Sequence, residues 1–214
     1  MRYDTISDQI WSYLMLRRSK NKPVRIGWVT KTNYYHPTVY LFDRLRQNRQ
    51  MRFKPLAEWI NKNTQDFYNE IYNPNKQYDI VIFLKIMTNM AIAETKKIKS
   101  YGGKVIFDAN VNYYEVWGNY PVPGTKPTEE QQEQAIWMTR NADFVVADST
   151  YIKNICVGLN QNVAWIPDNV DVSRQYTGQK EHIDKRRLTL VWSGQAKKAF
   201  HFELVEDCLY SYAE

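Results

Sequence analysis

Short apolar runs alternate with stretches of helical periodicity along most of this chain, and that alternation constrains the fold more than any other feature. The runs are VRIGWVT (24–30), DIVIFLK (79–85), KVIFDA (104–109), DFVVADS (143–149) and VAWIP (163–167). They are rich in β-branched and other apolar residues, which is typical of parallel strands buried on both faces. The sequence therefore predicts an α/β fold with a doubly wound parallel sheet covered by helices on both sides.

Helix signals occupy the intervals between these runs. Pro37 suits the first turn of a helix over 36–45, and Thr128 with Gln131 has the spacing of a capping box that opens a helix at Glu129. Another helix is expected from about Thr88 to the glycine pair at 102–103. Two apolar faces indicate two more helices: Leu56, Trp59, Ile60, Phe67 and Ile71 from about Pro55, and Ile152, Ile155, Cys156 and Leu159 after the fourth run.

Four segments of different composition organise the chain. Residues 1–22 predict a basic amphipathic helix that either packs on the domain or rests on anionic lipid. Residues 23–172 carry the alternating pattern of one domain, and residues 173–187 are polar without apolar periodicity, which indicates a linker. LTLVWSG then predicts a sixth strand, with a helix from about Ala199. One strand and one helix cannot form a domain, so residues 188–214 are expected to be the start of an incomplete second domain.

Basic residues cluster in two places, and the chain has a net charge of +6. Residues 11–25 carry five Lys or Arg and no acid, and residues 43–54 carry five against one. Such clusters favour nucleic acid, an anionic membrane surface or phosphate-bearing substrates, or they are a solvated face without a partner. No apolar run of about 18 residues and no signal-peptide core occur. With Cys156 and Cys208 as the two cysteines, a cytoplasmic chain with reduced thiols is expected.

An aromatic loop follows the third run. Residues 108–127 hold Tyr113, Tyr114, Trp117 and Tyr120 among prolines and glycines that break any regular element. Ligands of parallel α/β sheets bind beyond the carboxyl ends of the strands, where this loop begins. The rings either form a platform for the apolar face of a sugar or pin the loop to the domain. We expect Trp117 to anchor the loop and the partly exposed Tyr113 and Tyr114 to meet the ligand.

The later runs resemble a known enzyme family. NADFVVADSTYIKNI (141–155), VAWIPDNVD (163–171) and LTLVWSG (188–194), in this order and spacing, resemble the middle of GT-B glycosyltransferases of the large retaining, nucleotide-sugar-dependent group. The resemblance implies a Rossmann-like acceptor-binding domain, the start of a nucleotide-sugar-binding domain, and no metal or other cofactor. Two features depart from the family: TKTNYYHP (30–37) lacks the glycine pair that follows the first strand, and the glutamate pair of the second domain has no counterpart.

A complete enzyme of this type would move a hexose from a nucleotide diphosphate sugar to a sugar or lipid-linked acceptor, with retention of configuration. Two other functions stay open: a non-catalytic module that holds a glycan or a partner, and an RNA-binding protein. Parallel βα units without an RNA-recognition, KH or OB pattern argue against nucleic acid. The expected location is the cytoplasm, either free or held peripherally at the inner face of the membrane.

Candidate site residues lie after the predicted strands. His36 is the histidine best placed for proton transfer, and Asp108 is placed either to act as a base or to cap local N–H groups. Acceptor binding is expected from Lys31, Asn33, Tyr34, Lys85, Asn110, Tyr113 and Tyr114. By the resemblance, Gly194, Lys197 and Lys198 would meet the pyrophosphate of the donor. The three histidines are far apart in sequence and lack ligand-spaced neighbours, so no metal site is predicted.

Overall fold

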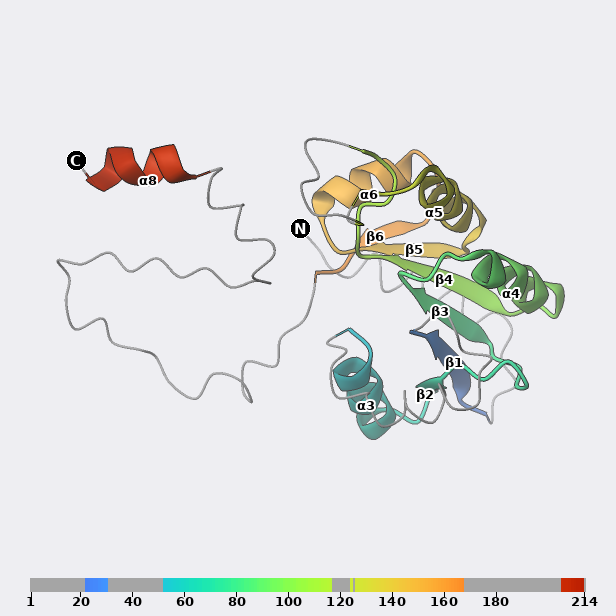
Figure 1. Ribbon diagram of the computed structural model, residues 1–214. Coiled ribbons are helices and arrows are strands. Elements are labelled where there is room, and N and C mark those ends of the chain that lie inside the picture. Colours follow the sequence, from blue (N-terminus) through green and yellow to red (C-terminus); the bar gives the residue numbers. More distant parts are fainter. Residues whose placement is uncertain (1–21, 31–51, 117–123, 125, 168–204, 214) are drawn as a thin grey trace. The chain divides into compact units, whose positions relative to one another are not determined.

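The computed structural model describes residues 22–30, 52–116, 124, 126–167 and 205–213 (Figure 1). The chain divides into two compact units, Met1–Glu115 with Pro127–Val170 and Val116–Lys126 with Asp171–Glu214. The described helix of the second unit is α8 (Glu206–Ala213), which overlaps the helix expected from about Ala199. The expected N-terminal helix, the linker and the strand over 188–194 lie outside the described residues.

Six parallel strands form one sheet in the described part of the first unit, in the order β2-β1-β3-β4-β5-β6. They are β1 (Val24–Val29), β2 (Phe67–Ile71), β3 (Ile80–Leu84), β4 (Lys104–Ala109), β5 (Phe144–Ala147) and β6 (Val163–Trp165). Each of the five apolar runs between residues 24 and 167 contains a strand, so the predicted parallel α/β sheet is confirmed.

The strand order contains a point at which the direction of winding reverses. From β1 the chain moves outward to β2, and from β3 it proceeds in the opposite direction to β6. The reversal lies between β1 and β3, which pair directly through Ile26↔Ile80 and the three following residues. In open parallel sheets the loops at the carboxyl ends diverge at this switch point and leave a crevice for ligands.

Helices cover both faces of the sheet, as Figure 1 shows. On one face, Phe53 and Ala57 of α3 (Lys54–Asn63) and its preceding turn pack with Ile26, Trp28, Ile80 and Leu84. On the other face, α4 (Asn89–Ser100), α5 (Glu129–Asn141) and α6 (Thr150–Val157) enclose a core that includes Val81, Phe83, Val105, Phe107, Met138 and Val145. Helices on both faces confirm the predicted doubly wound arrangement.

The prediction of a helix that includes Phe67 and Ile71 is wrong. α3 ends at Asn63, because Thr64 is extended with φ −135° and ψ 149°, and Phe67–Ile71 form the edge strand β2. Four residues are about one turn of a helix and also twice the two-residue period of a strand. Phe67 and Ile71 therefore share a face in either structure. Trp59, assigned to the apolar face, is in fact 61% exposed, and Ala57 is the buried residue of α3.

Side-chain caps begin the three helices that follow β3, β4 and β5. Thr88, Thr128 and Ser149 accept hydrogen bonds from the backbone of Ala91, Gln131 and Ile152. At Thr128 the predicted capping box is confirmed, because the Gln131 side chain also accepts from the Thr128 N–H at 3.0 Å. Thr88 and Ser149 come within a few residues of the ends of β3 and β5, so the amino ends of α4 and α6 lie near the carboxyl edge of the sheet.

Substitution of Gly103 by Ala should destabilise the turn between α4 and β4. The added Cβ would lie 2.9 Å from the Tyr78 carbonyl oxygen and 2.8 Å from Ile98 Cγ2, both closer than van der Waals contact. We expect a loss of about 1–3 kcal/mol in the free energy of unfolding, measured in urea. Gly158→Ala is the control, because its nearest contact would be an ordinary 3.4 Å. Equal losses in the two variants would contradict the steric explanation.

Candidate functional site

Five of the predicted site residues belong to the described part of the chain: Lys85, Asp108, Asn110, Tyr113 and Tyr114. They lie at or just after the carboxyl ends of β3 and β4. The other predicted residues, Lys31, Asn33, Tyr34, His36, Gly194, Lys197 and Lys198, lie outside the described residues, as do Trp117 and Tyr120.

Asp108 forms a buried ion pair with Arg52, a residue that the sequence did not single out. Arg52 Nε donates to Asp108 Oδ2 at 3.0 Å, and the two side chains are only 9% and 7% exposed. β4 positions the carboxylate, with Asp108 in register with Leu84 of β3 and Val146 of β5. Arg52 comes from the turn before α3, so the pair ties the start of that helix to the carboxyl end of β4.

The same guanidinium also holds the segment that follows β6. Arg52 Nη2 donates to the Ile166 carbonyl oxygen at 3.1 Å, and the Ile166 N–H donates to Ala147 of β5 at 2.9 Å. A planar guanidinium with several fixed N–H donors suits this role, because it can bind a carboxylate and a carbonyl at once. Arg52 therefore joins three parts of the carboxyl edge. In the sequence, Arg52 is one of the five basic residues of the run over 43–54, and that run is the feature that could have pointed to it.

Lys85 has a strained backbone at the switch point. It directly follows β3, and among the described residues it is the one non-glycine residue with a positive φ, 50°. The left-handed region costs an L-residue roughly 1–2 kcal/mol. The Lys85 N–H donates to the Asp108 carbonyl oxygen at 2.9 Å, which fixes this backbone against β4, and the side chain is exposed. Such strain often marks a functional position.

Two buried amide atoms follow β4 without hydrogen-bond partners in the described residues, Asn110 Oδ1 and Asn112 Nδ2. The other end of the Asn112 amide accepts from the Tyr114 N–H at 3.1 Å, which turns the chain. A buried polar atom left unpaired costs about 1–3 kcal/mol, so these two atoms are unused hydrogen-bonding groups at the start of the loop.

The expectation that Tyr114 is exposed to a ligand is wrong. Its side chain is 7% exposed, and the hydroxyl lies 2.6 Å from Thr139 Oγ1 and 3.3 Å from Cys156 Sγ. Burial raises the pKa of Tyr114, and the neighbouring thiol of Cys156 adds to that shift. Tyr113 packs partly buried against the same core. The partners on α5 and α6 make Tyr114 an anchor of the loop, the role that the sequence assigned to Trp117.

Two other aromatic side chains are exposed near the carboxyl ends of β5 and β6. Trp165, the last residue of β6, is half-exposed, and its indole N–H donates to the Asp148 carbonyl oxygen at 3.0 Å. Tyr151, in the first turn of α6, donates to Glu115 Oε2 at 2.6 Å. Both side chains are therefore oriented by a hydrogen bond while about half of each residue remains exposed.

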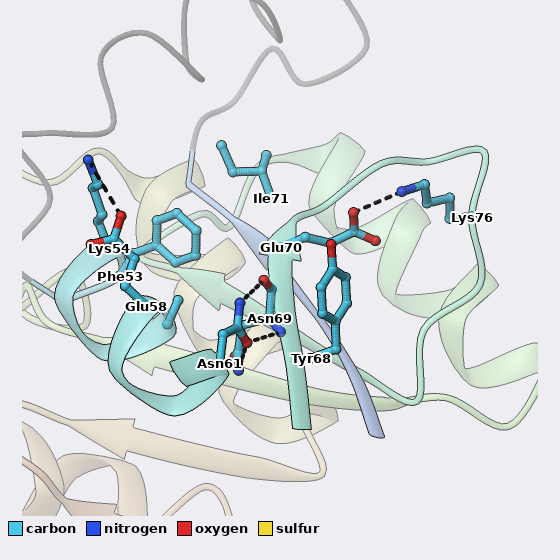
Figure 2. Close-up of a pocket in the computed structure, with 10 residues that line it drawn as sticks. Phe53, Lys54, Glu58, Asn61, Tyr68, Asn69, Glu70, Ile71 and Lys76 are labelled. Carbon is cyan, nitrogen blue, oxygen red and sulfur yellow. Dashed lines mark hydrogen bonds and ion pairs between the residues drawn. The ribbon is translucent and has the colours of Figure 1, made fainter. Parts of the chain in front are cut away.

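A separate hollow of about 380 Å³ lies between α3 and the edge strand β2 (Figure 2). We call it the edge groove; Phe53, Lys54, Glu58, Tyr68, Glu70 and Lys76 are among the residues that line it. Asn61 reaches across from α3 and pairs with the backbone of Asn69, accepting its N–H at 2.7 Å and donating to its carbonyl at 2.8 Å. The Asn69 amide oxygen in turn accepts from the indole of Trp28 at 2.9 Å.

Glu70 is the central residue of a network of ion pairs and hydrogen bonds at the edge groove. Lys76 lies at 2.8 Å and Arg25 at 2.9 Å from its carboxylate oxygens, and the hydroxyl of Tyr78 donates at 3.2 Å. Burial alone would raise the pKa of Glu70, but these hydrogen bonds and the charge of Lys76 outweigh burial and lower it. Glu70 is therefore ionised and paired at neutral pH.

No protein-family model, curated protein or solved structure matches the chain. In the described part of the chain, no helix is long and apolar enough to cross a membrane. Among those same residues, no group of three or more His, Cys, Asp or Glu side chains could hold a metal ion. A parallel α/β sheet supports many activities, so function has to be inferred from the side chains at the two sites.

Removal of Arg52 should strongly destabilise the first unit. We expect Arg52→Ala to lower the free energy of unfolding in urea by about 3–5 kcal/mol, because the buried carboxylate of Asp108 would lose its ion pair with Arg52. The exposed Arg140 at the end of α5 provides the control, and Arg140→Ala should change stability by less than about 0.5 kcal/mol. Arg52→Met combined with Asp108→Leu should recover most of the loss; a double variant as unstable as Arg52→Ala would assign the loss to packing instead of charge.

The hydroxyl of Tyr114 should contribute measurably to stability. Tyr114→Phe is expected to cost about 1 kcal/mol through its lost hydrogen bonds, and Tyr114→Ala about 3–5 kcal/mol through the cavity that it creates. Tyr113→Phe should be near neutral, since the hydroxyl of Tyr113 has no hydrogen bond in the described structure. Urea denaturation of the three variants tests this, and equal effects of the two Phe substitutions would show that the buried hydroxyl contributes nothing.

Proposed function

We propose that the first unit is the acceptor-binding half of a GT-B glycosyltransferase, with Lys85 holding an anionic group of the acceptor at the switch point. The observation that carries this proposal is the strained, exposed Lys85 beside the buried Arg52–Asp108 pair. The enzyme would transfer a hexose from a nucleotide diphosphate sugar to a sugar or lipid-linked acceptor, as the resemblance of residues 141–194 implies.

The strand order supports a ligand at this edge. Lys85 follows β3, one of the two strands that flank the reversal of winding, and Asp108 ends the neighbouring strand β4. In sheets of this kind the diverging loops leave room for a ligand at the reversal, whereas tightly packed loops fill the other positions.

Charge supports an anionic group there. The positive charge of Arg52 is compensated by Asp108 at 3.0 Å, whereas Lys85 forms no ion pair within the described residues. An ammonium on a flexible stem is a common phosphate ligand, because its three donors can adjust to different oxygen positions. A lipid-linked or phosphorylated sugar would supply those oxygens.

Polar atoms and rings at the same edge suit the sugar part of an acceptor. Asn110 Oδ1 is an acceptor without a partner in the described structure, so a sugar hydroxyl could donate to it. Trp165 and Tyr151 offer oriented, exposed rings for the apolar face of a pyranose. They take over the stacking role that the sequence assigned to Tyr114.

Transfer requires the acceptor oxygen to bond to the anomeric carbon of the donor while the bond from that carbon to the diphosphate oxygen breaks. The nucleotide diphosphate leaves with the bonding electrons, and the proton of the acceptor hydroxyl passes to a base. Asp108 is held by Arg52, so we assign it to positioning the guanidinium and the loop after β6. His36 remains a hypothesis for the base.

The carboxylate of Asp108 is already bound by Arg52, so it is not available as a catalytic base. This observation also favours a second function, a glycan-binding module without catalysis. The two functions differ in one measurement. A panel of nucleotide diphosphate sugars, supplied with saccharide and lipid-linked acceptors to the full-length protein, should release nucleotide diphosphate if the protein is an enzyme. Saccharide binding without any release would support the module.

Substitution of Lys85 separates binding from stability. Lys85→Ala should weaken binding of sugar phosphates such as glucose 1-phosphate by at least about tenfold, because a charge-assisted hydrogen bond is lost. Lys85→Gly should weaken binding equally and raise the free energy of unfolding by about 1 kcal/mol, since glycine adopts a positive φ without strain. Titration calorimetry and urea denaturation test the two effects.

Lys62→Ala provides the control, because Lys62 is an exposed lysine in the last turn of α3. Unchanged sugar-phosphate binding in both Lys85 variants would contradict the proposed role of this residue. A destabilised Lys85→Gly would show that the positive φ is not a source of strain.

A further inference from the structure

We propose that the edge groove between α3 and β2 is a second binding site, specific for a neutral saccharide and independent of the carboxyl edge. Its volume of about 380 Å³ falls within the range of about 300–1,000 Å³ that small-molecule sites occupy. Its lining combines the partly exposed ring of Tyr68, two ion pairs and the hydrogen-bonded amide of Asn61, and Figure 2 shows how these side chains lie. Each of these features restricts the class of ligand.

The positive and negative side chains of the groove balance one another, which argues against a charged ligand. Two cations and two acids line the groove, and they pair with one another: Lys76 with Glu70 at 2.8 Å, and Lys54 with Glu58 at 3.6 Å. A phosphate or a carboxylate would meet the acids, and a cation would meet the lysines. A neutral ligand with many hydroxyl groups suits both, because hydroxyls donate to carboxylates and accept from ammonium groups.

Tyr68 supplies a flat apolar surface on the side of β2 that faces away from α3 (Figure 2), so a ligand that contacts both Tyr68 and Asn61 has to span the edge of β2. The residue is 47% exposed on the edge strand, and it makes no hydrogen bond within the described residues. The C–H face of a pyranose can cover such a ring while its hydroxyls reach polar groups at the rim. Phe53 and Ala57, which are buried, belong to the apolar part of the lining.

Hydrogen-bonding capacity remains on three of the lining side chains. The Asn61 amide nitrogen uses one proton on the Asn69 carbonyl and keeps a second. Lys76 gives one of its three protons to Glu70. The side chain of Glu58 is 63% exposed, and the 3.6 Å between its Oε1 and Lys54 Nζ is too long for a good hydrogen bond. Because Asn61 is already fixed to β2, it would lose little entropy when a ligand binds.

The same contacts argue against an extended peptide as the occupant. A peptide that adds to an edge strand needs the outward N–H and C=O groups of that strand. In β2 the central residue Asn69 has both groups occupied by Asn61, at 2.7 and 2.8 Å. Asn61 therefore closes the edge to strand addition and leaves side-chain recognition as the means of binding.

The test uses the full 214-residue chain and a panel of methyl glucopyranosides, methyl galactopyranosides, maltose and cellobiose, titrated by saturation-transfer difference NMR. At least one neutral saccharide should bind. Tyr68→Ala should weaken that binding by about tenfold, and Tyr68→Phe should leave it nearly unchanged because the ring remains. The control is Trp59→Ala, which removes a ring of α3 that is 61% exposed, more than Tyr68, and does not line the groove.

Two further arms separate this site from the carboxyl edge. Lys85→Ala should not change binding of the neutral saccharide, and Tyr68→Ala should not change binding of glucose 1-phosphate. Loss of neutral-saccharide binding in Lys85→Ala with no effect of Tyr68→Ala would overturn the edge-groove proposal and leave the proposed function intact. An absence of binding by every neutral saccharide in the panel would overturn it as well, as would equal effects of Tyr68→Ala and Trp59→Ala.

Discussion

The ion pair between Arg52 and Asp108 is the interaction on which the carboxyl edge depends. It links residues 56 positions apart, and through the Ile166 carbonyl it extends to a third segment, 114 residues after Arg52. A buried pair of this kind adds little net stability compared with apolar residues, yet the loss of one partner is costly. We infer that its main effect is specificity, because the pair forms only when the start of α3, the end of β4 and the segment after β6 are brought together.

The conformation of Lys85 follows from the same centre. Asp108 accepts the Lys85 N–H through its carbonyl and binds Arg52 through its carboxylate, so one residue holds both neighbours. With β3 paired to β4 up to Leu84, the chain must turn away immediately afterwards, and Lys85 makes that turn with a φ of 50°. Glycine would satisfy this conformation without strain. A lysine there retains an exposed charge at the expense of stability, which is the compromise expected of a binding position.

The local sequence predicted features that depend on neighbouring residues and missed those that depend on distant ones. KVIFDA is β4 residue for residue, and the Thr128 capping box is present, because both are set by side chains within a few positions. β2 was assigned to a helix, because Phe67 and Ile71 fit both periods and only the pairing with β1 decides between them. Arg52 and Tyr114 have their partners 56 and 25 or more residues away, so no local pattern could identify either role.

The carboxyl edge and the edge groove differ in how their polar groups are satisfied. At the carboxyl edge the structure leaves a strained Lys85 and buried amide atoms of Asn110 and Asn112 without partners in the described residues. The proposed ligand would form hydrogen bonds with these amide atoms that folding leaves unmade, which favours strong and orienting contacts. In the edge groove the charges are paired and Asn61 is fixed to β2, so a ligand gains only the stacking on Tyr68 and the spare hydrogen bonds. The two proposed sites would therefore differ in the strength of binding that they can support as well as in the charge of the ligand: orienting contacts suit a group held for reaction, and weak, reversible contacts suit a neutral saccharide.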